Sequence, residues 1–102
     1  MARIVILYPN TPDARFDMEY YTNSHLALVR DLLGDAVVSI SVHKGVGGPG
    51  GSPARFGIST AIECRDMQSL IAAISAGEEK IGQDVANFTT IEPTIQIEEK
   101  IV

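Results

Sequence analysis

The sequence predicts an α+β domain in which two helices pack against a four-stranded antiparallel sheet. Residues 16–34 and 66–77 carry apolar side chains at helical spacing, and four other segments show the apolar runs or alternation of strands. In chain order the segments are strand, helix, strand, strand, helix, strand. A glycine-rich loop between the two middle strands predicts an antiparallel hairpin. This order in one small domain is the split βαβ, or ferredoxin-like, arrangement with both helices on one face of the sheet.

The chain begins with an expected strand over residues 3–8, where consecutive branched apolar residues are typical of a central strand. A turn rich in proline leads into the first helix. Asp17 is expected to cap this helix, because its carboxylate can accept a hydrogen bond from a first-turn backbone N–H. Phe16 and Tyr21 stand at the two positions of a hydrophobic staple. Gly34 is expected to end the helix in a left-handed conformation.

One face of the first helix is apolar except for a single ionisable residue, His25. The residues predicted to share this face are Met18, Tyr21, Leu28, Val29 and Leu32, with Leu33 at its edge. An imidazole in the middle of an apolar stripe requires either a hydrogen-bond partner in the core or a functional role. His25 is therefore the first candidate for a functional residue.

The two middle strands are expected over residues 36–46 and 55–64, and their alternation has two consistent orientations. The apolar row is Val38, Ile40, Phe56 and Ile58, and the small or polar row is Ser39, Ser41, Gly57, Ser59 and Ala61. If the apolar row lies on the face without helices, a second copy of the chain must cover it, and the small row leaves space beneath the helices. The opposite orientation buries the apolar row beneath the helices. Periodicity alone allows both orientations.

The second half of the chain is expected to add one helix and the closing strand. Asp66 is predicted to cap the helix, and Gly77 is predicted to end it. Residues 78–88 have apolar side chains at helical spacing and predict a short irregular helix. Residues 94–102 alternate between apolar and polar side chains and predict the last strand.

Composition indicates one domain over residues 1–102. The chain is 45% hydrophobic, but none of its apolar runs approaches the roughly 20 residues of a membrane span. The net charge of −5, without a basic patch, argues against nucleic acids and anionic membranes as partners. The lone cysteine, Cys64, cannot form an internal disulfide and reads as a small apolar residue at a strand end. We therefore expect a cytoplasmic protein.

Two segments carry a resemblance to a known family. Residues 16–29, Phe-Asp-Met-Glu-Tyr-Tyr-Thr-Asn-Ser-His-Leu-Ala-Leu-Val, resemble the signature of the EthD family, which is named after a protein from ethyl tert-butyl ether degradation. Residues 84–89, Asp-Val-Ala-Asn-Phe-Thr, followed by Pro93 and a final strand, resemble the C-terminal half of that family. Members often have a proline after the histidine, where this chain has Ala27, a difference that affects local backbone more than side-chain chemistry.

The resemblance implies a ferredoxin-like protomer that pairs sheet to sheet into a dimeric α/β barrel. It also implies a ligand cleft between helices and sheet, into which the motif histidine, His25, points. This favours the orientation with the apolar row on the dimer face. Relatives in the wider superfamily include monooxygenases, lactone isomerases and polyketide cyclases. The EthD family itself has no single established reaction.

His25 and Tyr21 are the candidate catalytic residues. A buried neutral imidazole is a plausible general base toward an enolisable substrate proton, and the resemblance strengthens this interpretation. The alternative is a core histidine bonded to a backbone carbonyl or a tyrosine hydroxyl. Tyr21, four residues earlier on the same face, is placed to bond His25 or a ligand oxygen, or else is a large core side chain. Tyr20 is expected on the surface or in an interface.

The strands supply five candidate ligand-binding residues, Tyr8, Ser39, Ser41, His43 and Ser59. The three serines belong to the small row that would face the cleft in the favoured orientation. His43 follows them on the same row, either at the mouth of the cleft or in solvent near a strand end. Tyr8 ends the first strand, where an aromatic ring either lines a pocket or covers the core.

Neither a metal nor a cofactor is expected. The two histidines and Cys64 lie in unrelated segments without the spacing of metal ligands. The loop residues 45–50 match the glycine pattern of a dinucleotide fingerprint, but a strand follows them where the fingerprint requires a helix N-terminus. The loop is interpreted as a flexible hairpin connection, with a lid over the cleft as a further hypothesis.

The sequence leaves three functional hypotheses open. The first is a cofactor-independent isomerase, cyclase or oxygenase-like enzyme of degradative or secondary metabolism that acts on a small hydrophobic carbonyl or polyketide-like compound through His25 and Tyr21. The second is a binding or accessory protein that holds a small apolar ligand in the same cleft without chemistry. The third is a structural interpretation in which the cleft is filled. In the first two hypotheses, the expected partners are a second copy of the chain, which forms a homodimer, and a small hydrophobic ligand.

Overall fold

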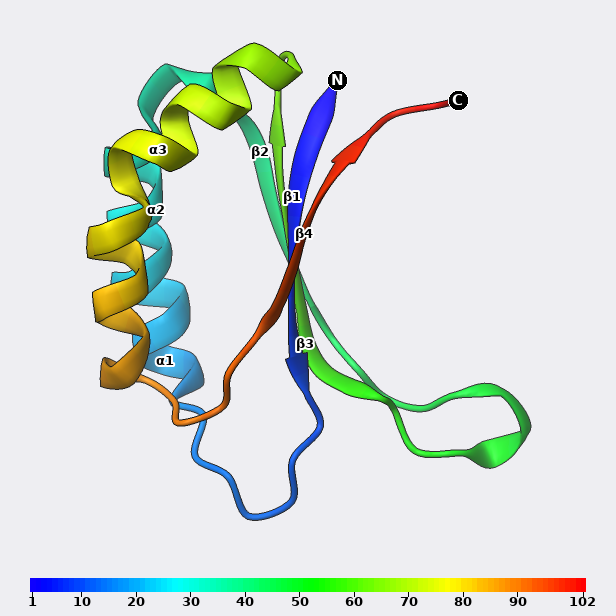
Figure 1. Ribbon diagram of the computed structural model, residues 1–102. Coiled ribbons are helices and arrows are strands. Elements are labelled where there is room, and N and C mark those ends of the chain that lie inside the picture. Colours follow the sequence, from blue (N-terminus) through cyan, green and yellow to red (C-terminus); the bar gives the residue numbers. More distant parts are fainter.

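The computed structural model describes residues 1–102 and has the predicted α+β, ferredoxin-like fold (Figure 1). Its sheet contains four antiparallel strands in the order β2-β3-β1-β4. The strands are β1 (Ala2–Pro9), β2 (Val37–Lys44), β3 (Phe56–Cys64) and β4 (Thr94–Glu99). The helices are α1 (Met18–Tyr20), α2 (Leu26–Leu33) and α3 (Met67–Asp84). A π-helical turn, Tyr21–His25, joins α1 and α2 into one continuous helix.

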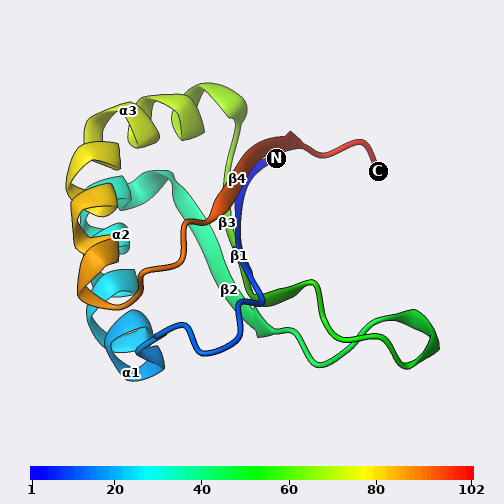
Figure 2. The same cartoon turned by 60° about the horizontal axis from the view of Figure 1, so that its bottom comes forward.

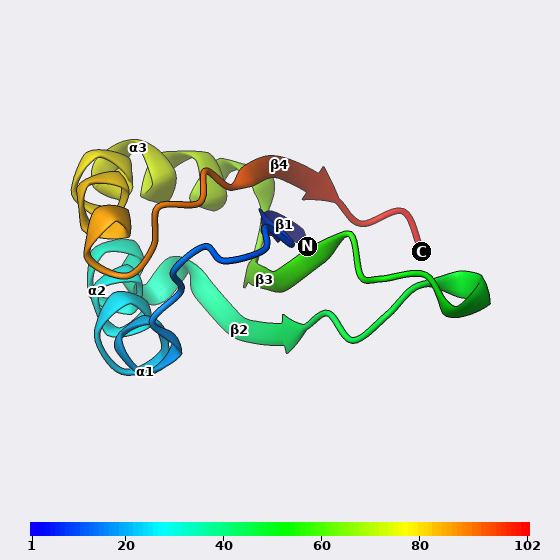
Figure 3. The same ribbon diagram turned by 90° about the horizontal axis from the view of Figure 1, so that it is seen from below.

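All helices lie on one face of the sheet, and the opposite face is uncovered (Figures 1 and 3). The α1–α2 helix lies on the β2 side, while α3 lies on the β4 side (Figures 2 and 3). The loop between β2 and β3 extends away from the helices (Figures 1, 2 and 3). The hypothesis that this loop forms a lid over a helix–sheet cleft is therefore wrong. No helix combines the length and hydropathy of a membrane span.

The first helix begins and ends as its sequence predicts. The Asp17 carboxylate accepts a hydrogen bond from the backbone N–H of Tyr20 at 3.0 Å. The rings of Phe16 and Tyr21 meet with their centroids 5.1 Å apart, as the hydrophobic staple requires. Gly34 has φ +58°, a value that favours glycine because a Cβ would clash with the backbone.

Helix α3 is longer than the second helix that the sequence predicts. Its N-cap is confirmed, since the Asp66 carboxylate accepts the Ser69 N–H at 2.7 Å. Gly77 does not end the helix, which continues to Asp84 and closes in a 3₁₀ turn over residues 85–87. Gly77 is buried, and a Cβ added there would lie 3.1 Å from Cβ of Leu32. The glycine allows close packing against α2, where the sequence analysis predicted a helix end.

The middle strands have the opposite orientation to the one that the family resemblance favours. Ile58 packs with Tyr8, Tyr21 and Phe88, and Ile40 packs against the Val29 cluster, so the apolar row lies beneath the helices. The row of Ser39, Ser41, Gly57, Ser59 and Ala61 therefore lies on the uncovered face. The apolar stripes of the helices need apolar partners, and serines there would leave voids in the core. Val38 is half exposed, beside a β-bulge that shifts the register between Val37 and Ser39.

The core beneath the helices consists of connected clusters. One is aromatic, with Tyr8, Tyr21 and Phe88 at its centre. At the other end of the sheet, Leu70 of α3 is fully buried with Ala2 and Cys64. Burial raises the pKa of the Cys64 thiol, as expected for an apolar packing role. The closing strand β4 ends at Glu99, and Ile101 and Val102 beyond it are exposed.

We expect Leu70→Ala to lower the free energy of unfolding by about 2–5 kcal/mol, because it removes a fully buried side chain and leaves a cavity. The matched control is Ile71→Ala on the next residue, which is 46% exposed and should cost about 1 kcal/mol or less. Urea unfolding monitored by circular dichroism measures both. Equal losses for the two variants would contradict the described packing of α3.

Candidate functional site

A cleft of about 440 Å³ opens between α2, α3, β1 and β4. Its walls are formed mainly by branched apolar side chains, among them Ile4, Ile6, Ile62, Ile74, Ile81 and Val85. On the β4 side its rim contains Ile95 and Ile97, which are 54% and 44% exposed. The volume lies in the range of small-molecule pockets. The core beneath the helices is therefore not completely filled.

Two buried residues of this cleft each have a polar side-chain atom without a hydrogen-bond partner in the protein: Nε2 of His25 and the hydroxyl of Tyr8. The two residues are only 4% and 2% exposed, and both line the cleft. Every fully buried side-chain nitrogen or oxygen in the structure has a hydrogen-bond partner. Because these two atoms have none, they must be at least slightly accessible to solvent. A polar group that ends in an apolar cavity is costly unless water or a ligand bonds to it.

The other ring nitrogen of His25 is anchored by Asp84 at the end of α3. His25 Nδ1 lies 2.8 Å from Oδ2 of Asp84, and the Asp84 side chain is only 13% exposed. The hydroxyl of Tyr20 donates to Oδ1 of Asp84 at 2.6 Å, and the amide of Asn87 donates to the same oxygen at 2.9 Å. Three donors thus converge on one carboxylate.

These bonds determine the charge of Asp84 and the tautomer of His25. Burial acts to raise the pKa of Asp84, but the hydrogen bonds from Tyr20, Asn87 and His25 outweigh it and hold this pKa below its usual value. An ionised carboxylate can only accept hydrogen bonds. Nδ1 of His25 must therefore carry a proton, and in the neutral imidazole Nε2 presents its lone pair to the cleft.

The π-helical turn orients the two buried side chains of the motif. The N–H of Leu26 bonds to the carbonyl of Tyr21, five residues earlier, which widens the turn. The buried residues of this helix are consequently Tyr21, His25, Val29 and Leu33, each four after the last. Leu33 is thus central where it was expected at the edge, and Met18 is 39% exposed.

Tyr21 supports His25 without a hydrogen bond between them. The two rings stack at an interplanar angle of 17°, with centroids 5.4 Å apart. The Tyr21 hydroxyl is paired with the hydroxyl of Thr60 on β3, at 2.5 Å. Burial raises the pKa of Tyr21, so the phenol stays protonated. Tyr21 does not line the cleft, and the predicted bond to His25 is not formed.

Tyr8 is the aromatic residue that does reach the cleft. Its ring meets Phe16, Tyr21 and Phe88 edge-on, with centroid distances of 5.1–6.0 Å. Burial, with a smaller contribution from Tyr21, raises the pKa of Tyr8 well above its usual value. The hydroxyl therefore remains a hydrogen-bond donor. Of the five predicted ligand-binding residues, only Tyr8 shares the cleft with His25.

The other four, Ser39, Ser41, His43 and Ser59, lie on the uncovered face of the sheet. His43 pairs with Ser59 across β2 and β3, and Ser41 pairs with Ala61. Successive side chains of a strand point to opposite faces, so the burial of Ile58 and Thr60 beneath the helices directs Ser59 away from them. The sequence-based placement of these four residues in the helix–sheet cleft is wrong.

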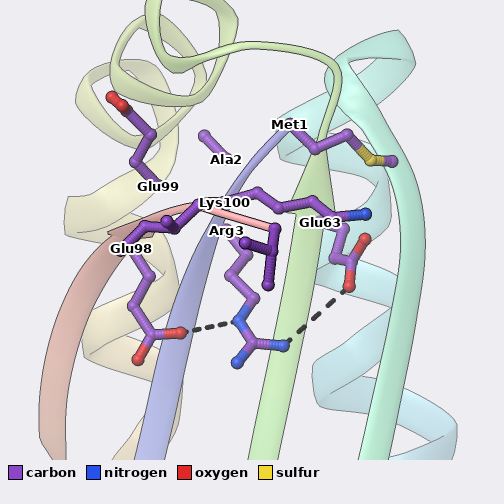
Figure 4. Close-up of a pocket in the computed structure, with 9 residues that line it drawn as sticks. Met1, Ala2, Arg3, Glu63, Glu98, Glu99 and Lys100 are labelled. Carbon is purple, nitrogen blue, oxygen red and sulfur yellow. Dashed lines mark hydrogen bonds and ion pairs between the residues drawn. The ribbon is translucent and has the colours of Figure 1, made fainter.

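A second hollow lies near the chain termini and is charged (Figure 4). The Arg3 guanidinium points between two carboxylates, with Nε 2.6 Å from Glu98 and Nη1 4.0 Å from Glu63. These groups pair with one another on the exposed surface. Unlike the cleft, the hollow therefore offers no unpaired buried polar atom. No group of three or more His, Cys, Asp or Glu side chains is arranged to hold a metal ion.

Sequence reasoning missed Asp84, Tyr20 and Asn87. Tyr20 was expected on the surface or in an interface, yet its hydroxyl bonds to Asp84. Asp84 and Asn87 were noticed only as part of the segment that carries the family resemblance. A signal was available there, because an Asp and an Asn three residues apart at a helix end can converge on one site. Nothing in the sequence indicated that this site was the His25 ring.

No family model matches the chain, and no curated protein matches it. Among solved structures, an EthD-like protein from Ralstonia eutropha JMP134 is 35% identical, with a TM-score of 0.89 over 99% of this chain and 92% of that chain. An EthD family protein from Bacillus halodurans C-125 is 25% identical, with a TM-score of 0.77 over 99% of both chains. A dimeric protein of ferredoxin-like fold from Bacteroides fragilis NCTC 9343 is 11% identical, with a TM-score of 0.52 over 97% of this chain and 95% of that chain, and shares the fold.

The tautomer of His25 can be tested directly. At about pH 8 the neutral imidazole should carry its proton on Nδ1 in the wild type, because the Asp84 carboxylate accepts it. Asp84→Asn should remove this preference, since an amide can donate as well as accept. Ring ¹⁵N chemical shifts measure the two tautomers. Asp31→Asn, an exposed carboxylate of α2, is the control that should change nothing, and an unchanged His25 spectrum in Asp84→Asn would contradict the assignment.

Proposed function

Because this chain belongs to the EthD family, we propose that it serves small-molecule metabolism by acting on a small hydrophobic carbonyl compound through cofactor-free acid–base chemistry at His25. One observation carries the proposal. A mostly apolar cleft is lined by His25 and Tyr8, two residues more than nine-tenths buried, and the Nε2 of the one and the hydroxyl of the other have no hydrogen-bond partner in the protein. The pair comprises one base and one hydrogen-bond donor.

The lining of the cleft favours a neutral ligand. It contains no lysine or arginine, and its one carboxylate, Glu78, lies on α3. A carboxylate or phosphate group on the ligand would therefore find no cation to balance its charge. Branched apolar walls suit an aliphatic or aromatic body, and the Tyr8 hydroxyl suits a carbonyl oxygen.

The proposed reaction is proton abstraction next to the carbonyl group. The Tyr8 hydroxyl donates a hydrogen bond to the carbonyl oxygen while Nε2 of His25 removes a proton from the adjacent carbon. The C–H bond breaks, its electron pair forms an enolate, and the proton remains on His25. The Asp84 carboxylate stabilises the resulting imidazolium. Return of the proton to another carbon would give an isomer, and attack of the enolate on a second carbonyl would close a ring.

The alternative is a protein that holds a small apolar ligand without chemistry. The same apolar walls and the same two polar atoms support it, because each atom can also serve as a fixed hydrogen-bond partner. The two functions differ in one measurable respect, which is proton exchange on a bound ketone.

We also propose that two copies pair through the uncovered sheet face. Val5 and Leu7 lie on this face beside Ala61 and Ser59, their partners across β1 and β3. Leu7 supplies apolar surface beside Val5, which is 8% exposed, and the small side chains of Ser59 and Ala61 allow two sheets to approach closely. Ile40 and Ile58 of the apolar row are packed beneath the helices, so this row does not support a dimer. The support now comes from this small-residue surface and from the family resemblance.

Exchange of the α-protons of 2-tetralone in D₂O, followed by NMR, tests the reaction. We expect the wild type to accelerate exchange above the buffer rate and His25→Gln to lower the enzymatic rate by about 100-fold or more. Tyr8→Phe should also lower the rate by about 100-fold, because the developing oxyanion loses its donor. His43→Gln is the matched control, since His43 lies on the opposite face and should leave the rate unchanged.

Full exchange activity in His25→Gln would contradict the proposed role of His25. A wild type that binds 2-tetralone without exchanging its protons would support the binding function instead. A wild type that neither binds nor exchanges the ketone would overturn both.

Light scattering after size exclusion tests the dimer. We expect the wild type to have twice the 11.0 kDa chain mass. Ala61→Arg should give a monomer, because it places a charged, bulky side chain at the centre of the small-residue face. Glu79→Arg on the exposed surface of α3 is the control and should remain dimeric. A monomeric wild type at micromolar concentration would refute the dimer.

A further inference from the structure

Helix α3 contains two glycines, Gly77 in its interior and Gly82 in its last turn. Glycine is among the least favourable residues in a helix interior, because it loses more backbone freedom on folding than alanine and contributes no side chain. Each of the two therefore calls for a structural reason.

Gly77 has a packing reason. It is buried, and a Cβ added there would lie 3.1 Å from Cβ of Leu32 and 3.4 Å from Cδ1 of Ile81. Any larger residue would push α2 and α3 apart.

Gly82 has no such reason. A Cβ at this position would meet no heavy atom within 4 Å, so the backbone of α3 has room for a side chain. Its φ is not in the left-handed region, so the conformation is open to any L-residue. Neither packing nor backbone geometry accounts for glycine at residue 82.

What distinguishes Gly82 is its position on the cleft. It is one of the cleft-lining residues, together with Ile81 and Val85, which follow each other at helical spacing, and with His25 of the first helix. The missing side chain therefore leaves a notch in the α3 wall, at an exposed position of the cleft lining.

We infer that Gly82 is a specificity-determining position, at which the notch admits the part of a ligand that extends beyond the carbonyl group held at Tyr8 and His25. This inference rests on the proposed function. The ligand segment at the notch is not anionic, because the cleft has no cation and Glu78 lies one helical turn before Gly82, while Ile81 and Val85 supply apolar contacts. A side chain at residue 82 would occupy the space that this segment needs.

The test uses a series of alkyl phenyl ketones from acetophenone to octanophenone, with dissociation constants from ligand-observed NMR titration. Gly82→Leu should weaken the binding of the longer ketones by at least about tenfold while acetophenone changes little. Gly82→Ala should have a smaller effect in the same direction and should raise Tm by a few degrees, because alanine favours the helix. Gln83→Leu is the matched control, since it adds the same side chain one residue away, outside the cleft lining.

Four outcomes are informative. Selective loss of the longer ketones in Gly82→Leu, with Gln83→Leu unchanged, supports the inference. Wild-type affinities throughout the series in Gly82→Leu would overturn it and leave the proposed function standing. Equal losses in Gly82→Leu and Gln83→Leu would also overturn it, as a general effect on the helix. A wild type that binds no ketone of the series would overturn the inference and the proposed function together.

Discussion

The hydrogen bond between Asp84 and His25 is the interaction on which the candidate site depends. It connects the end of α3 to the π-helical turn of the first helix, two segments 59 residues apart in the chain. Because Asp84 is ionised and Tyr20 and Asn87 already donate to its other oxygen, the His25 ring has one orientation and one tautomer. This arrangement leaves Nε2, the other ring nitrogen, without a hydrogen-bond partner at the cleft.

Much of the fold could be predicted from the sequence because its signals are local. Asp17 and Asp66 cap helices through their own carboxylates, and Gly34 ends a helix through its own backbone conformation. The orientation of the middle strands could not be predicted in this way, because alternation is identical for either face. The decision rests on which row fills the space beneath two apolar helix stripes, and Ile40 and Ile58 do so.

The site was predicted only in part, for the same physical reason. The apolar spacing around His25 identified the residue and its burial, but its partner comes from a distant helix that was expected to end at Gly77. The π-helical turn depends on tertiary packing, so helical periodicity misplaced Met18 and Leu33. Of the alternatives open for Tyr21, the structure shows the large core side chain: its hydroxyl bonds to Thr60 on β3, and its ring stacks on His25 without a hydrogen bond between them.

The absence of a cation from the cleft lining bears on how the proposed reaction could be catalysed. A neutral ketone would bind without charge, and negative charge would develop on its oxygen only as His25 takes up the proton. The imidazolium, held by Asp84, and the Tyr8 hydroxyl would then be the groups that stabilise the enolate. Both interactions are stronger in the transition state than with the bound ketone, and only such a difference accelerates the chemical step. A permanent lysine in the cleft would instead favour ligands that are already anionic.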